Sequence, residues 1–351
     1  MKTLLTFILL SIIMTASVFG MYGYNNDWID FLVDSSQLRA RMDQFGFILG
    51  NDNIRGTLGF KADTGSFGNI MNYVNNGKSS LDATVSAGLA YTSNPISIGI
   101  GYNYTYIDSQ LDVHTPVLLL NALDNSLRIC IPFQISSSKN VENSDYLGLS
   151  TTTEMRYYTG KDSINAVRLY INYGKNLYKN GTIVNSASSF GFELRFYFIP
   201  VTIETVWINP FIKILYASSL DAKGKGVIDE NIDNLVNVQS HSRILYSYNA
   251  NEIYESNPYI VRITQALSLY ASSEFATLYF EPSIGYKIIY NGKKGGNLIH
   301  TLTWGAYSEV RLHPVKDLEW YFEMGVNSGA NNSIPVNFRS ATGINWYLPK
   351  I

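Results

Sequence analysis

Apolar and polar residues alternate strictly between residues 96 and 107. One phase is apolar or aromatic and consists of Ile96, Ile98, Ile100, Tyr102, Tyr104 and Tyr106. The other phase is small or polar and consists of Ser97, Gly99, Gly101, Asn103 and Thr105. Because successive side chains of a β-strand point to opposite faces, this period of two predicts a strand with one apolar face.

The same alternation recurs along the chain and predicts fourteen strands after residue 53. They lie at residues 54–62, 81–91, 96–107, 116–123, 127–135, 147–157, 167–173, 190–198, 203–216, 259–270, 278–290, 298–312, 318–326 and 338–348. Their apolar faces are too numerous for one packed core. The pattern therefore predicts an all-β fold, an antiparallel transmembrane β-barrel whose outer face meets lipid. In the strand described above, we expect Ile98, Ile100 and Tyr102 to face lipid and Gly99, Gly101 and Asn103 to face the lumen.

The charged residues of these strands lie on the phase opposite the apolar residues. A charge that faces lipid costs about 2–4 kcal/mol near the bilayer midplane, so this segregation predicts that they face the lumen. The candidate lumen-facing residues are Arg128, Arg168, Glu193, Arg195, Arg262, Glu281 and Arg311. They carry both signs, so we expect any pore to be only weakly ion-selective.

The connections between the predicted strands alternate in length. The short ones are residues 93–95, 124–126, 158–164, 199–202, 271–275 and 313–317. The mostly longer ones are residues 63–80, 108–115, 136–146, 175–189, 217–258, 291–297 and 328–337. Outer-membrane barrels combine short periplasmic turns with longer external loops. We therefore expect the long connections outside the cell and both chain ends in the periplasm.

The N-terminal part leaves the strand count open. Residues 38–49 could pair with residues 54–62, but an even count then requires a further strand at residues 24–33. The barrel thus has fourteen strands and a separate segment, residues 21–53, that is periplasmic or plugs the lumen, or it has sixteen strands. Fourteen is favoured because residues 24–33 lack clean alternation.

Residues 1–20 resemble a secretory signal peptide. Lys2 is followed by an apolar stretch at residues 4–13, and Val18 and Gly20 suit a cleavage site. An N-terminal anchor is the alternative, but the stretch is short for a membrane span. We therefore divide the chain into a signal peptide (1–20), an N-terminal segment (21–53) and a barrel (54–351).

The longest connection, residues 217–258, is expected to be a main external surface. Three of its tyrosines are candidate contacts for protein partners, because tyrosine offers a rigid amphipathic ring: Tyr246, Tyr248 and Tyr254. Four apolar residues within it have helical spacing: Ile228, Ile232, Leu235 and Val236. Two alternatives remain open, an external loop with a short helix and a segment that folds into the mouth and constricts a pore.

The chain shows little sign of catalytic chemistry. Cys130 is the only cysteine, which excludes an intramolecular disulfide, and no two of the four histidines have the spacing of a metal-binding pair. His241 is the only candidate for a hydrolytic site. The net charge of −2 gives no footprint for nucleic acid. We therefore expect no enzyme and predict no catalytic, cofactor or metal residues.

The first sixty residues resemble the variable surface proteins of intestinal spirochaetes. The resemblance lies in Met21-Tyr22-Gly23, in Asp27-Trp28-Ile29-Asp30-Phe31-Leu32, and in the run from Arg39-Ala40-Arg41 to Gly50-Asn51. It implies a major surface-exposed antigen of the outer envelope, present in variant copies and assembled with its relatives. The partners implied are outer-membrane lipid, related surface proteins and host antibodies.

Overall fold

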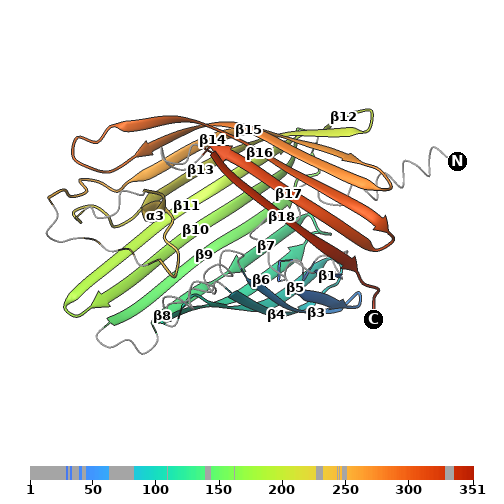
Figure 1. Cartoon of the computed structure of the whole chain (residues 1–351), viewed down its shortest axis with the longest axis horizontal. Coiled ribbons are helices and arrows are strands. Elements are labelled where there is room, and N and C mark those ends of the chain that lie inside the picture. Colours follow the sequence, from blue (N-terminus) through green and yellow to red (C-terminus); the bar gives the residue numbers. More distant parts are fainter. Residues whose placement is uncertain are drawn as a thin grey trace, which may run out of the picture.

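The chain forms a closed antiparallel β-barrel in a computed structural model (Figure 1). The structure describes residues 29–30, 32–33, 39–41, 45–62, 83–108, 110–138, 144–161, 163–226, 232–242, 244, 246, 251–328 and 336–351. The proposed signal peptide lies outside the described residues. No helix within the described part of the chain is long and apolar enough to cross a membrane.

Eighteen strand segments and one short helix make up the described structure. The first nine strands are β1 (Arg39–Arg41), β2 (Gly46–Gly50), β3 (Ile54–Ala62), β4 (Ala83–Tyr91), β5 (Ile96–Tyr106), β6 (Leu111–Ala122), β7 (Leu127–Pro132), β8 (Gln134–Ser138) and β9 (Ser144–Tyr158). The others are β10 (Ile164–Asn180), β11 (Ile183–Phe198), β12 (Val201–Ile203), β13 (Val206–Ser219), β14 (Tyr259–Ser272), β15 (Ala276–Tyr290), β16 (Leu298–Val315), β17 (Leu318–Ser328) and β18 (Val336–Tyr347). The helix is α3 (Ile232–Val236).

Two pairs of segments, β7 with β8 and β11 with β12, each form a single interrupted strand. The eighteen segments therefore make a described barrel of sixteen strands. β7 and β8 both lie between β6 and β9, and β12 follows β11 along β13. The barrel closes through β1, which pairs with β18 on one side and with β2 on the other. The favoured count of fourteen is therefore wrong and the alternative of sixteen is right.

The first strand is not where the sixteen-strand alternative placed it. Residues 38–49 cover β1 and all of β2 except Gly50, and each strand is too short to show a clear alternation. Ile29, Asp30, Leu32 and Val33 belong to no strand, although they lie within the predicted segment 24–33. The N-terminal segment thus contributes two short strands and, ahead of them, residues that lie inside the barrel.

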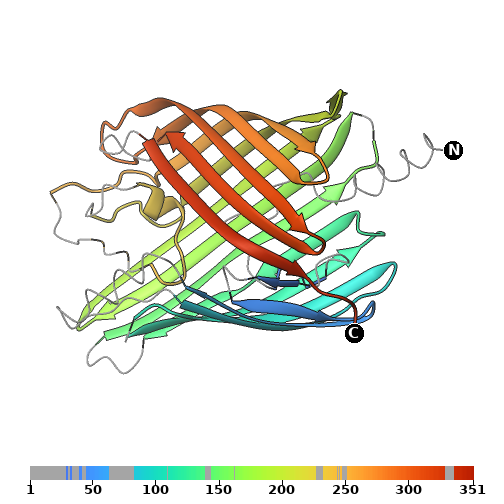
Figure 2. The ribbon, with the colours of Figure 1, turned by 45° about the vertical axis from the view of Figure 1, so that its right-hand side comes forward.

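The connections predicted to be short lie at one end of the barrel, and those predicted to be long lie at the other (Figures 1 and 2). The predicted long connection at residues 175–189 is wrong. β10 and β11 continue through it as paired strands and are joined by Gly181 and Thr182 alone. Both faces of this hairpin extension carry polar residues, since strand ends beyond the lipid need no apolar face. The alternation that reveals a membrane strand is therefore absent there.

The two faces of the wall follow the alternation. On β5, the side chains of Ile98, Ile100 and Tyr102 are 50%, 62% and 45% exposed on the outer face. Gly101 lies on the opposite face, against the side chain of Ile29. In this strand the structure therefore has the apolar residues on the outer face and the small residues on the inner face, as predicted.

Candidate functional site in the lumen

Five basic residues stand side by side on the inner wall. Arg128 on β7 is the cross-strand partner of Arg156 on β9, which is also the partner of Arg168 on β10. Arg168 is in turn opposite Arg195 on β11, and Arg195 is opposite Lys213 on β13. We call these five residues the basic row. Directly opposed side chains have Cβ atoms about 4.5–5.5 Å apart, so the row brings five basic side chains together on adjacent strands.

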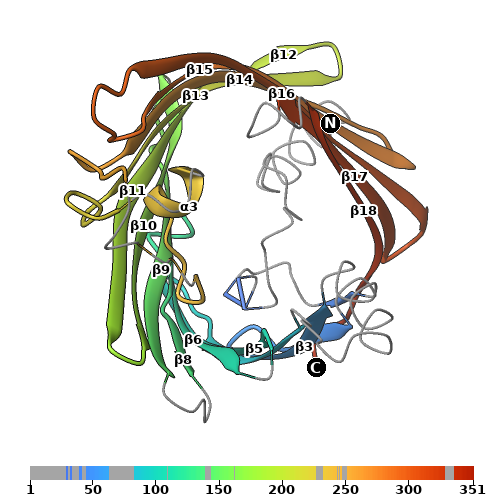
Figure 3. The ribbon, with the colours of Figure 1, turned by 60° about the vertical axis from the view of Figure 1, so that its left-hand side comes forward.

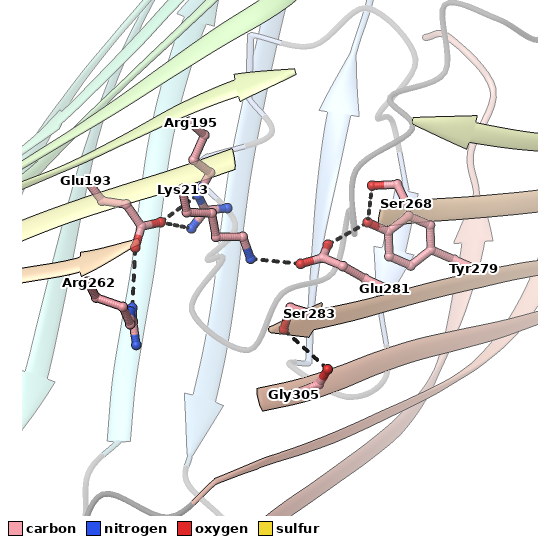
Figure 4. A network of polar contacts seen from close by, with 9 residues as sticks. All are labelled: Glu193, Arg195, Lys213, Arg262, Ser268, Tyr279, Glu281, Ser283 and Gly305. Carbon is pink, nitrogen blue, oxygen red and sulfur yellow. Dashed lines mark hydrogen bonds and ion pairs between the residues drawn. The ribbon is translucent and has the colours of Figure 1, made fainter. Parts of the chain in front are cut away.

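Three carboxylates pair with the row, and Figure 4 shows two of them, Glu193 and Glu281. Glu193 lies between Arg195, at 2.5 Å, and Arg262 on β14, at 3.5 Å. Glu281 on β15 accepts a hydrogen bond of 2.8 Å from the Lys213 ammonium and another of 2.7 Å from the Tyr279 hydroxyl. The third carboxylate, Glu154, lies 3.5 Å from Arg156. The predicted lumen residues on this side are thus brought into one network.

Tyrosine rings hold two of the arginines in place. The Arg195 guanidinium lies 4.6 Å from the centre of the Tyr170 ring, and that of Arg168 lies 5.4 Å from the Tyr197 ring. Tyr197 is itself stacked on Phe211, with ring centres 4.6 Å apart. Rings under the guanidinium planes orient these cations and add cation–π attraction.

The neighbouring part of the wall, on β16 and β17, is acidic. Glu309 and Glu323 are direct cross-strand partners, and both are buried. Arg311, the last of the predicted lumen residues, forms an ion pair with Glu309, which also accepts a hydrogen bond from the Tyr307 hydroxyl. The lumen therefore carries both signs as predicted, but the signs are separated between two parts of the wall.

The connection between β13 and β14 folds into the barrel. Figure 3 looks along the barrel and shows α3 inside the ring of strands. The rings of Tyr246 and Tyr254 are 5% and 2% exposed and pack in a cluster with Leu235 and Val238. The prediction that these two tyrosines are external contacts is therefore wrong, and Tyr248 lies outside the described residues. Burial, together with the Asp221 carboxylate, raises the pKa of the Tyr246 phenol.

A short piece of this connection, residues 237–242, lies directly on the wall, and we call it the docked segment. It crosses two glycines of the inner face: a Cβ atom on Gly148 would overlap the Ser240 carbonyl oxygen, and one on Gly174 would overlap the Val238 carbonyl oxygen. Only glycine permits so close an approach of two backbones.

Hydrogen bonds fix the docked segment to the wall. The Tyr146 hydroxyl donates to the Ser240 carbonyl at 2.5 Å. The Ser240 amide donates to the Ser150 hydroxyl, and the Val238 amide donates to Ser189. Of the two alternatives for the connection between β13 and β14, the structure therefore shows the one that folds into the barrel.

A second piece of chain covers the inner face of β4 to β6. Ile29, Leu32 and Val33 are buried at 2% exposure or less and pack with Val117 and Leu119 of β6. The Cys130 thiol lies 3.3 Å from the Asp30 carboxylate in the same region. The N-terminal segment thus contributes a small apolar core inside the barrel.

Sequence reasoning missed the basic row and the docked segment for the same reason. The phase of each charged residue was visible, but which residues stand opposite one another depends on strand register. The glycines at positions 148 and 174 were a local signal, since each replaces a side chain on the inner phase of a strand.

Comparisons with known proteins identify the family of the chain. No curated protein matches the chain. Among solved structures, the β domain of the Bordetella autotransporter Brka is similar, with a TM-score of 0.34 and 8% identity, covering 77% of this chain and 95% of that one. The family model of the Serpulina hyodysenteriae variable surface protein matches residues 1–347. The chain therefore belongs to the variable surface protein family.

Proposed function

We propose that the protein is a major variable antigen of the outer membrane, presented to the host by the rim of its barrel. Family membership carries this proposal. The exposed surface we propose is the hairpin of β10 and β11 rather than the connection at residues 217–258. β10 has seventeen residues, whereas about 9–11 residues cross a bilayer, so its far end stands clear of the lipid.

The connections of the barrel support a proposed orientation. Short turns and the C-terminus share one end, where the Ile351 amide donates to the Gly50 carbonyl. Short turns are periplasmic in outer-membrane barrels, which supports an external position for the opposite end. The external end then contains Gly181, at the tip of the β10–β11 hairpin, and the periplasmic end contains Gly160.

Epitope tags at the two ends of β10 test this arrangement. Gly160 and Gly181 both lie in turns with open space around them, so a tag at either site is tolerated by the wall. We expect antibody labelling of intact cells for the tag at Gly181 and labelling only after the outer membrane is opened for the tag at Gly160. The reverse result would contradict the proposed orientation, and no labelling of the Gly181 tag on intact cells would contradict the antigen role of the hairpin.

The partners that we propose follow from the same role. They are outer-membrane lipid around the apolar outer face, related surface proteins in a homo- or hetero-oligomer, and host antibodies at the rim. We propose no catalytic activity. Crosslinking of intact cells followed by identification of the linked chains tests the oligomer.

A diffusion pore is the second candidate function. It is favoured by the sixteen strands, because barrels of this size leave an aqueous channel, and by the charged inner wall. Purified protein in planar bilayers with KCl on both sides should show stepwise conductance. Absence of conductance from protein that is folded by heat-modifiability on a gel would exclude the pore and leave the antigen role intact.

A further inference from the structure

Two pairs of a tyrosine and a histidine face outward from the barrel with the same geometry. On β5 and β6, the Tyr102 hydroxyl is hydrogen-bonded to Nδ1 of His114. On β15 and β16, the Tyr286 hydroxyl lies 2.9 Å from Nδ1 of His300. In both pairs the histidine is the diagonal cross-strand neighbour of the tyrosine, displaced toward the end with the long connections. The two pairs lie on opposite sides of the barrel (Figure 3).

Both pairs belong to the outer face of the wall, toward the proposed external end. Tyr102 and Tyr286 are 45% and 49% exposed, on the same phases as the exposed Ile100 and Ile284. β15 begins with Ala276 at the opposite end, and about 9–11 residues cross a bilayer. Tyr286 therefore lies where its strand leaves the hydrocarbon layer, which is the level at which amphipathic rings gather in membrane proteins.

The two histidines differ in the partner of their second ring nitrogen. Nε2 of His114 lies 3.7 Å from the carboxylate of Asp112, which is two residues earlier on the same strand. The residue two before His300 is Leu298, whose side chain carries no charge. Among the described residues, Tyr286 is the only hydrogen-bond partner of the His300 side chain. One pair thus receives an anion from the chain itself, and the other does not.

The second ring nitrogen of His300 can donate a hydrogen bond. An imidazole whose Nδ1 accepts from a phenol carries its proton on Nε2, and a protonated imidazole carries one on each nitrogen. The side chain is exposed on the outer face, and an N–H that met only hydrocarbon there would lose its hydrogen bond. At the boundary of the bilayer, the phosphates of lipid headgroups are anionic acceptors of the kind that such a donor binds strongly.

We infer that His300, oriented by Tyr286, binds the phosphate group of an outer-leaflet lipid. The inference rests on the proposed outer-membrane location and names the lipid group that this face of the barrel recognises. The phosphate takes the place that the Asp112 carboxylate has beside His114. A free phosphate ion offers the same oxygens, but only a lipid also covers the adjacent apolar wall, where Leu302 is 63% exposed.

The test uses the refolded full-length protein in dodecyl maltoside micelles that contain one of two lipids. These are dilauroyl phosphatidylcholine and dilauroylglycerol, which has the same acyl chains without the phosphate. The thermal unfolding midpoint of the wild type should be about 2–4 °C higher with phosphatidylcholine. His300→Phe should lose this difference, because its ring has no nitrogen. His300→Gln should retain it, because its amide can donate from near the position of Nε2.

His114→Phe is the matched control. It removes the same ring from the pair that contains its own carboxylate, so it should change the midpoint equally in the two lipids. Inorganic phosphate added to the dilauroylglycerol micelles tests the free ion and should leave the midpoint of the wild type unchanged. Heat-modifiability on a gel establishes that each variant is folded before its midpoint is measured.

Three results would overturn the inference. The first is an equal difference between the two lipids in the wild type and His300→Phe, and absence of a difference in the wild type counts as this result. The second is a loss of the difference in His114→Phe as large as that in His300→Phe. The third is the same rise of the midpoint with inorganic phosphate alone.

Epitope labelling at Gly181 tests the location separately. Labelling of intact cells without the phosphatidylcholine difference refutes the lipid site and leaves the outer-membrane location. The phosphatidylcholine difference without labelling refutes the exposed hairpin and leaves the lipid site.

Discussion

Two described segments of the chain lie inside the barrel, and they bind separate parts of the wall through different interactions. On the wall of β4 and β5, strands of nine and eleven residues, the N-terminal residues Ile29, Leu32 and Val33 dock through apolar side chains. On the wall of β9 to β11, strands of fifteen to seventeen residues, the docked segment lies against glycine and is held through its backbone by serine and tyrosine hydroxyls.

The two contacts differ in how strongly they depend on particular residues of the inner wall. Apolar side chains can shift by small rotations, so the first contact tolerates small changes in the wall. Backbone carbonyls cannot move without moving the whole segment, so the second contact depends on particular glycines. Both walls keep the same apolar outer face, and the two environments are independent because successive residues of a strand point to opposite sides.

The largest effect is expected from the glycines under the docked segment. The double variant Gly148→Ala, Gly174→Ala places two Cβ atoms where carbonyl oxygens now lie. We expect the segment to leave the wall, at a cost of about 3 kcal/mol or more in the free energy of unfolding, measured by denaturant in vesicles. Trypsin should then cleave after Lys225 much faster. Gly325→Ala is the control, because an added Cβ there meets nothing closer than 3.8 Å. Equal protease resistance in the double variant and the wild type would contradict the docking.

The lipid contact of the two walls should differ with depth. Ile100, on β5, is 62% exposed in the middle of its strand, and Leu177, on β10, is 42% exposed near the external end. Ile100→Arg should lower the free energy of unfolding by about 2–4 kcal/mol, and Leu177→Arg by about 0–1 kcal/mol. Refolding into vesicles under denaturant titration measures both. Equal losses of stability in the two variants would show that the β10–β11 hairpin does not extend beyond the lipid.

Substitutions in the apolar contact of the N-terminal segment should cost less stability than those under the docked segment. A Cβ atom at Gly101 would lie 2.5 Å from the Ile29 side chain, which can move. We expect Gly101→Ala to cost about 1–2 kcal/mol, and the added change Ile29→Ala to remove part of that penalty. The four proteins of this double-mutant cycle are compared by denaturant unfolding. Strict additivity of the two changes would mean that Ile29 does not lie on Gly101.

The smallest effect is expected from one hydroxyl. Tyr146→Phe removes the donor to the Ser240 carbonyl and should cost about 0.5–1.5 kcal/mol, with a modest rise in protease sensitivity of the docked segment. Tyr178→Phe serves as the control, because Tyr178 is the cross-strand neighbour of Tyr146. If the two variants lose the same stability, the hydroxyl of Tyr146 has no special part in docking.

Part of the candidate site was visible before the structure. The phase of every predicted lumen cation could be assigned from its neighbours, because lipid excludes charge and the alternation records that exclusion. The basic row could not be assigned, since its five members are separated by tens of residues and meet only through strand register. Register depends on turn lengths, and the turn between β10 and β11 differs from the one expected.

The sequence by itself determined the barrel, its antiparallel order and the outer face of each of the fourteen predicted strands, because the hydrophobic effect acts on each of these strands locally and leaves a period of two. Only the tertiary structure decided that sixteen strands close the ring. The closing strand β1 has three residues and carries no periodicity of its own. The tertiary structure also decided that Tyr246 and Tyr254 lie inside. Their position depends on the inner face of strands up to about a hundred residues earlier, such as Gly148 and Gly174, and no local pattern encodes such a contact.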